Sequence, residues 1–153
     1  MNKRTGVAWL AAAWMLLGAV LLLVSGSGVP SRAAVQVEKV MVDPVDLTVS
    51  EPSGTDLFTV TLTSEPTVMV YVDLSTSNMQ CSVSPASLEL DATNWAAGAI
   101  ATVSAVDDAI ADGTQICRVF TEKSRSEDPN FHLLSVRDVK VTVYDDDVQD
   151  IVV

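Results

Sequence analysis

Three groups of acidic residues stand where runs of alternating hydrophobic residues end. They are Glu51, then Asp107, Asp108 and Asp112, and last the triplet Asp145, Asp146 and Asp147. Adjacent carboxylates raise one another's pKa, so a fold that gathers them must keep them solvated or bind a cation. Calcium suits such a cluster, because it takes about six to eight oxygen ligands in a flexible geometry. The sequence therefore indicates a calcium site, although each group taken alone is equally consistent with a polar turn.

The segments between these acids alternate hydrophobic and polar residues, as half-buried β-strands do. In residues 56–63, Phe58, Val60 and Leu62 fall on one face and threonines on the other. A turn over residues 64–67 follows, and the alternation resumes over residues 68–74, so we expect a hairpin or a neighbouring pair of strands. Further strands are expected at residues 39–42, 47–50, 80–83, 87–90, 99–106, 115–122 and 137–144.

No convincing amphipathic helix occurs after residue 33, so the fold class is all-β. About seven strands in about 100 residues predict an immunoglobulin-like antiparallel β-sandwich. Trp95 lies in a turn between two expected strands and should cap one end of the core. Loops gather at the two ends of a sandwich, and a single end could hold all three acidic groups.

The N-terminal segment has the form of an export signal. Lys3 and Arg4 precede an uncharged apolar run over residues 6–24. Small residues, Ser31 and Ala33, precede a possible cut before residue 34 and favour a cleaved signal peptide. The run also approaches the length of a membrane-spanning helix, roughly 20 residues, so an uncleaved N-terminal anchor stays open. In both cases we expect the rest of the chain to be exported, either secreted or held at the cell surface.

The expected organisation is one domain behind this segment. Residues 1–33 are the signal peptide or anchor, 34–39 a linker, 40–148 the β-sandwich, and 149–153 a C-terminal tail. About 120 residues after the cut suffice for one core and not for two. Removing residues 1–33 takes away three basic residues and no acid, so the net charge falls from −11 to about −14. Such a surface disfavours nucleic acid and anionic lipid.

Cys81 and Cys117 are the only cysteines and both lie in the exported part. An even count in an oxidising compartment suggests a disulfide, and two buried free thiols are the alternative.

Several motifs in order resemble the Calx-beta domains, in particular the bacterial repeats of large surface proteins. The resemblance covers about residues 40–148 and is carried by six segments. They are Val49-Ser50-Glu51-Pro52-Ser53-Gly54, Val83-Ser84-Pro85-Ala86-Ser87-Leu88, Ala92-Thr93-Asn94-Trp95, Val106-Asp107-Asp108-Ala109-Ile110-Ala111-Asp112-Gly113, Glu127-Asp128-Pro129-Asn130-Phe131 and Asp145-Asp146-Asp147.

The resemblance implies a calcium site at one end of the sandwich. It assigns the first ligand to Glu51, an aspartate pair to Asp107 and Asp108, and a third contribution to the Ile110 carbonyl with Asp112. The triplet Asp145, Asp146 and Asp147 would complete the site. Two departures are visible, since Gln115 and Asn78 stand where further carboxylates would help. Fewer charges imply fewer bound ions or weaker binding, with a dissociation constant of about 10⁻⁴ to 10⁻³ M.

No enzyme signature accompanies this pattern. The exported part has a single histidine, His132, without a nucleophile motif, and it has no zinc spacing, phosphate loop or dinucleotide fingerprint. We therefore expect a non-catalytic calcium-binding module in a cell-surface or adhesion context. The alternative is a calcium-independent adhesion domain that binds a surface or matrix protein or a glycan. A remnant of a longer repeat protein is a third reading.

Overall fold

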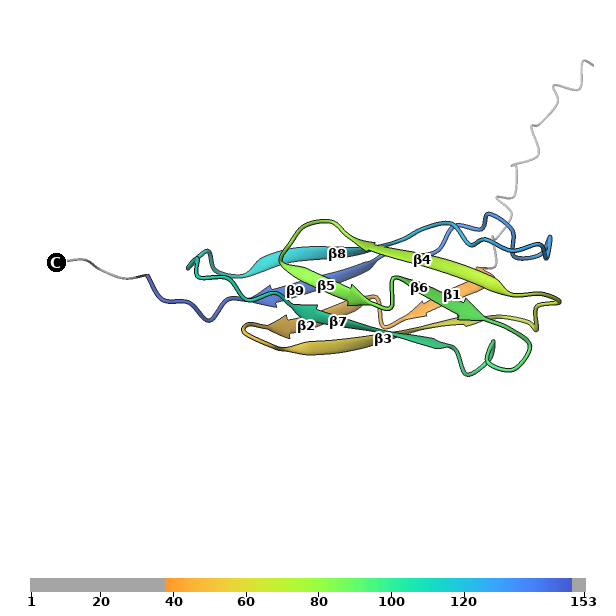
Figure 1. Cartoon of the computed structure of the whole chain (residues 1–153), viewed down its shortest axis with the longest axis horizontal. Helices are drawn as coiled ribbons and strands as arrows, with labels where there is room; N and C mark the ends of the chain where they lie inside the picture. The colour runs from red at the N-terminus through yellow and green to blue at the C-terminus, as the bar shows by residue number, and fades with distance from the viewer. Residues whose placement is uncertain (1–37, 150–153) are drawn as a thin grey trace, which may run out of the picture. The chain divides into compact units, whose positions relative to one another are not determined.

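A computed structural model describes residues 38–149, where nine strands form two sheets of a sandwich (Figure 1). The strands are β1 (Val40–Asp43), β2 (Asp46–Ser50), β3 (Thr55–Leu62), β4 (Val70–Thr76), β5 (Cys81–Ser84), β6 (Ser87–Leu90), β7 (Ala99–Ala105), β8 (Gln115–Thr121) and β9 (Val139–Tyr144). Each begins and ends within two residues of its expected bounds. The expected signal or anchor segment of residues 1–33 lies outside the described residues, as do most of the linker and tail.

The all-β sandwich predicted from the sequence is confirmed. The structure has nine strands where about seven were expected, because two of the expected strands pass from one sheet to the other and are each divided into two. One sheet has the order β1-β3-β7-β5 and the other β2-β9-β8-β4-β6. Pro44 separates β1 from β2, and Pro85 separates β5 from β6. Proline has no amide hydrogen to donate to a ladder, so it suits the point where a strand leaves one sheet for the other.

The expected pairing of residues 56–63 with 68–74 is wrong. Strand β3 lies in the four-stranded sheet between β1 and β7, whereas β4 lies in the five-stranded sheet between β6 and β8. The connection over residues 63–69 therefore crosses from one sheet to the other instead of folding back. Val68 falls in this connection and is 46% exposed, although the alternation placed it on the buried face.

The hydrophobic core fills the space between the two sheets. The inward residues of β3 and β9 are almost fully buried, among them Phe58, Val60 and Val141. Trp95 is half-buried and packs against this core, as expected, while Phe131 from the loop between β8 and β9 is 1% exposed. The described residues contain no helix of the length and apolarity that a membrane crossing needs.

One parallel pair decides which strand ends lie together. The pairing of β2 with β9 is parallel, and Ser50 stands opposite Tyr144 at the end of both strands. On the other sheet, the end of β7 lies beside the start of β3, with Ser104 opposite Thr55. Because the turn of residues 51–54 joins β2 to β3, the segments that follow β2, β7 and β9 all meet at one end of the sandwich.

The expected disulfide is confirmed, and it joins the two sheets. Cys81 begins β5 in the four-stranded sheet, and Cys117 lies in β8 of the five-stranded sheet. Both residues are buried, and their Cα atoms are 6.1 Å apart. The bond crosses the core near the end where the acidic groups gather.

Candidate metal centre

Glu51 is placed by the last hydrogen bond between β2 and β9. Its amide donates to the Tyr144 carbonyl at 2.9 Å, so the acid lies directly beside the start of the aspartate triplet. A tight turn then leads into β3, with the Gly54 amide donating to the Ser50 carbonyl at 2.6 Å. A Cβ on Gly54 would collide with the Ser50 backbone, so only glycine fits this turn.

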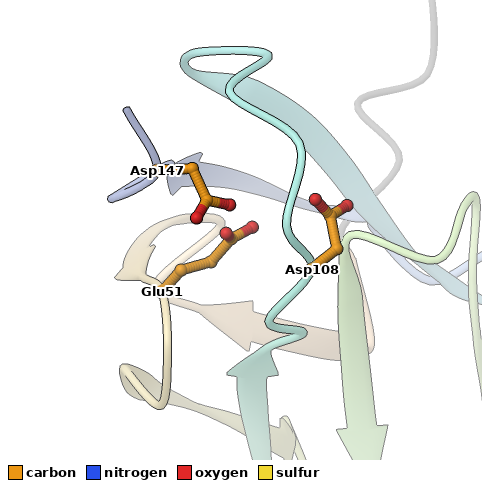
Figure 2. A group of neighbouring side chains, drawn as sticks. All are labelled: Glu51, Asp108 and Asp147. Atoms are coloured by element: carbon orange, nitrogen blue, oxygen red, sulfur yellow. The ribbon is translucent and has the colours of Figure 1, made fainter. Parts of the chain in front are cut away.

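The structure brings five of the predicted carboxylates together in two overlapping groups. Glu51, Asp108 and Asp147 form one group, and Glu51, Asp107 and Asp146 form the other. Within each group, one carboxylate oxygen from every residue lies within 4.8 Å of the others. Figure 2 shows the carboxylates of Glu51 and Asp147 facing one another, with Asp108 beside them on the segment after β7. Glu51 is common to both groups and is therefore the centre of the cluster.

Glu51 is also the most buried of these acids. As a residue it is 8% exposed, its carboxylate accepts no hydrogen bond from residues 38–149, and its oxygens keep some contact with solvent. Burial raises the pKa of Glu51 above its usual value, and the charges of Asp108, Asp145, Asp147 and Asp107 raise it further. The ionised form of Glu51 is therefore disfavoured in the fold, and a cation beside it would offset the repulsion from the neighbouring acids.

Asp147 shares this environment from the opposite side of the cluster. Burial raises its pKa first, and the neighbouring Asp145 and Asp146 raise it further. Its Oδ2 atom is buried without a hydrogen-bond partner among residues 38–149. The segments that follow β2 and β9 thus bring the carboxylates of Glu51 and Asp147 to the same space, and one oxygen of Asp147 is unsatisfied there.

Asp145 is used differently from its two neighbours in the triplet. Its Oδ2 accepts a hydrogen bond from the Gly113 amide at 2.6 Å, and its Oδ1 accepts one from the Asp147 amide at 2.7 Å. These bonds hold the pKa of Asp145 below its usual value. Asp145 therefore ties the loop after β7 to the segment after β9, and it remains outside the two groups centred on Glu51.

Asp112, another predicted ligand, lies in the loop after β7 but outside the two groups of carboxylates, and the predicted Ile110 carbonyl belongs to the same loop. The Asp112 carboxylate accepts a hydrogen bond from Gln80 at 3.4 Å. The Ile110 carbonyl accepts one from the Asp112 amide at 2.6 Å, and the Ile110 side chain is 62% exposed. The Ile110 amide in turn donates to Asp108 at 2.8 Å, which turns this loop back toward the cluster.

Three amide side chains next to the cluster make hydrogen bonds that the sequence did not indicate. Gln115 Nε2 donates to the Asp112 carbonyl at 3.0 Å, and Asn78 Nδ2 donates to the Ile116 carbonyl at 3.0 Å. Gln80 was expected only as the first residue of a strand, because a single glutamine at a strand end carries no pattern that indicates a contact. Its role is visible only from its contacts with the loop after β7.

Asp128 lies at the other end of the sandwich and is not part of the cluster. It is 2% exposed, and its carboxylate accepts hydrogen bonds from the Thr67 amide, the Thr67 hydroxyl and the Asn130 amide, each at 2.8 Å. These bonds lower its pKa to about 2. Asp128 therefore joins two loops as an internal acceptor.

The comparisons with known proteins support the fold. No family model matches the sequence, and no curated protein does. Among solved structures, CBD12 from CALX1.2 is 12% identical with a TM-score of 0.51, covering 70% of this chain and 44% of that one. WR4, a C. elegans MSP family member, is 13% identical with a TM-score of 0.48 and coverages of 71% and 99%. The apo-form Calx CBD1 domain is 12% identical with a TM-score of 0.47 and coverages of 71% and 96%.

This chain spans less than half the length of the CBD12 chain. At 12% identity the likeness concerns the arrangement of strands and not the residues that bind or react. The chain thus has a β-sandwich fold similar to that of a Calx domain structure.

Proposed function

We propose that residues 40–148 form an exported, non-catalytic calcium-binding module of the Calx-beta type. The observation that carries the proposal is Glu51, a residue more than nine-tenths buried whose carboxylate lies among four others and accepts no hydrogen bond from residues 38–149. The unsatisfied Asp147 Oδ2 atom supports it independently. Together they describe a space that lacks positive charge and offers oxygen ligands.

The donor set fits calcium in its chemistry. Both groups centred on Glu51 consist of carboxylates and contain no histidine or cysteine. Oxygen donors favour hard cations over zinc or copper, and carboxylates that arrive from several loops suit the flexible coordination of calcium. Glu51, Asp107, Asp108, Asp146 and Asp147 would hold the ion, which would neutralise their charge. Asp145 and the remaining loop residues would keep these ligands in place.

Export is proposed from the sequence and agrees with the disulfide. A buried bond between Cys81 and Cys117 is typical of proteins from oxidising compartments. The net charge of the exported part disfavours nucleic acid and anionic lipid, so a cell-surface or matrix protein or a glycan is the proposed partner class.

The test is a calcium titration of the oxidised protein by calorimetry, with melting curves in chelator and in calcium. We expect saturable binding at about 10⁻⁴ to 10⁻³ M and a higher melting temperature in calcium. Glu51→Gln should abolish both effects. Glu65→Gln is the matched control, because it removes the same charge from an exposed turn at the other end of the sandwich.

Absence of heat and of any thermal shift at several millimolar calcium would refute this function. The calcium-independent adhesion domain would then be the better account, with the core and the disulfide alone stabilising the fold.

A further inference from the structure

The loop of residues 106–114 carries two of the five clustered carboxylates but has little packing of its own. None of its residues is buried, and only Asp108 is even partly so. A loop without buried apolar side chains opens easily unless hydrogen bonds from outside hold it. Its conformation must therefore depend on neighbouring segments.

Two of the external bonds come from a single residue in the turn between β4 and β5. The Gln80 carbonyl accepts a hydrogen bond from the Val106 amide at 3.1 Å, where the loop begins. The Gln80 side chain donates to the Asp112 carboxylate at 3.4 Å, near the end of the loop. Gln115 adds a third bond, from its side chain to the Asp112 carbonyl at 3.0 Å.

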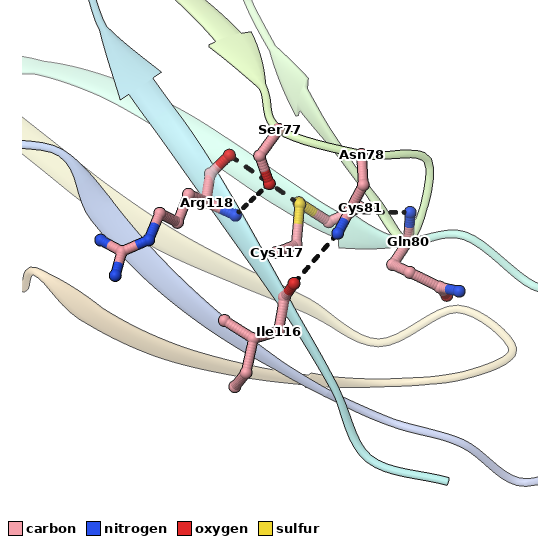
Figure 3. Close-up of a disulfide and its surroundings, with 7 residues drawn as sticks. All are labelled: Ser77, Asn78, Gln80, Cys81, Ile116, Cys117 and Arg118. Atoms are coloured by element: carbon pink, nitrogen blue, oxygen red, sulfur yellow. Dashed lines mark hydrogen bonds between the residues drawn. A yellow bond between two sulfur atoms is a disulfide. The ribbon is translucent and has the colours of Figure 1, made fainter. Parts of the chain in front are cut away.

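The turn that contains Gln80 is itself fastened to β8, as Figure 3 shows. Asn78 donates to the Ile116 carbonyl at 3.0 Å, and its own Oδ1 accepts from the Gln80 amide at 3.2 Å. The Arg118 amide donates to the Ser77 hydroxyl at 2.9 Å. The disulfide lies between these contacts, because Cys81 directly follows Gln80 and Cys117 stands between Ile116 and Arg118.

We propose that the Cys81–Cys117 disulfide and the amide side chains of Asn78, Gln80 and Gln115 hold the loop of residues 106–114 in its calcium-binding conformation. These bracing residues thereby set the affinity of the site without touching the ion. The inference rests on the proposed function. Amides are suited to the task because they fix the loop without adding charge to a cluster that already holds five carboxylates. A loop ordered in advance loses less conformational freedom when the ion binds, so it binds more tightly.

Two variants test this by calorimetric titration with calcium. Cys81→Ala/Cys117→Ala removes the covalent link, and Gln80→Ala removes one amide while the disulfide is kept. We expect about tenfold weaker binding in the first variant and a severalfold loss in the second. Asp128→Asn is the control, because it destabilises the fold at the opposite end and should leave calcium affinity unchanged.

Hydrogen exchange in chelator gives a readout that does not depend on calcium. Both bracing variants should speed exchange at the Ile110 and Gly113 amides and leave the Thr67 and Asn130 amides as they are. Failure of the unaltered protein to bind calcium would overturn the proposed function. Hydrogen exchange would still test whether the bracing residues hold the loop of residues 106–114. Unchanged exchange at Ile110 and Gly113, or unchanged affinity in both variants, would overturn the bracing role. The single-residue Gln80→Ala variant keeps the test valid if the cysteine variant does not fold.

Discussion

The amide of Glu51 donates a hydrogen bond to the carbonyl of Tyr144 at 2.9 Å, which joins the ends of two strands that are far apart in the sequence. Glu51 follows β2 at this bond, and the triplet that starts with Asp145 follows β9 at the same bond. Because β2 and β9 are parallel, their final residues must lie at the same end of the sandwich. Clustering of the acids is thus a consequence of strand direction, and the cluster should have measurable effects on stability.

Metal-free protein should be stabilised when Glu51 loses its charge. Burial and four neighbouring acids raise the pKa of Glu51, so the ionised carboxylate is disfavoured in the fold. In chelator at pH 7, we expect Glu51→Gln to melt a few degrees higher than the unaltered protein. In saturating calcium the order should reverse, because the variant gains nothing from the ion. A variant that is less stable in both conditions would contradict this account.

The advantage of Glu51→Gln in chelator should also depend on pH in a defined direction. A carboxyl group whose pKa is raised by folding holds its proton longer in the folded state, so stability falls as pH rises through the interval above 4.5. The two proteins should therefore melt at similar temperatures below pH 4.5, and the gap should widen above it. Melting curves from pH 4 to pH 8 in chelator measure this gap. A gap that stays constant with pH would show that charge is not its cause.

Asp128→Asn should lower the melting temperature at pH 7 by several degrees. The Asn side chain has only one oxygen, so its NH2 group would face either the Thr67 donors or the Asn130 amide. At least one of these donors would then lose its acceptor. The pKa of Asp128 is lowered to about 2, so its contribution is complete above the usual value of 3.8 and is lost as pH falls through about 2. The difference between variant and unaltered protein should therefore shrink between pH 4 and pH 2. An equal difference at both ends of that range would count against the ionised form.

Removal of the disulfide should cost stability without changing the fold. In the chain-entropy model, a bridge that spans 36 residues contributes about 4 kcal/mol. Urea unfolding of Cys81→Ala/Cys117→Ala against the oxidised protein measures this, and thiol labelling of the unreduced protein should detect no free thiol. A midpoint unaffected by the double substitution would mean that the bridge adds nothing to stability.

Two glycines with positive φ differ in how much space a Cβ atom would have beside them. Gly98 has φ +88, and a Cβ there would lie 2.8 Å from the Val60 carbonyl oxygen and collide with Thr59. Gly113 has φ +71 and nothing within 4 Å of the same position. Alanine should therefore destabilise at both sites through backbone strain, by about 1 kcal/mol, and cost more at Gly98 because of the contacts with β3. Urea unfolding in chelator compares the two variants, and equal losses would argue against the crowding.

Alternation of residue types was enough to locate the strands and most of the core. Phe58 and Val60 are buried as their spacing indicates, since the period of a strand is a local property. Which strands pair with one another, by contrast, depends on residues far apart in the sequence. The turn after Leu62 has the composition of a hairpin, yet β3 and β4 lie in different sheets, because the hydrophobic faces of both must meet across the core.

The sequence predicted the clustering of acids that directly follow neighbouring strand ends. Glu51, Asp108 and Asp147 follow strands that end together, so the order of motifs along the chain anticipated their meeting. Asp112 and Asp145 instead bond to Gln80 and to backbone amides. Such bonds depend on how two loops dock, and no spacing within one segment encodes that.

The parallel pair of β2 and β9 has a mechanical consequence. The described domain begins with β1 and β2 and ends after β9, and its first and last residues lie at opposite ends of the sandwich (Figure 1). Tension between them would pull β2 and β9 past one another along their length. The hydrogen bonds from Asp46 opposite Lys140 to Ser50 opposite Tyr144 would bear that load together, and would not open one after another. The domain could lengthen under such tension only after these hydrogen bonds had broken together.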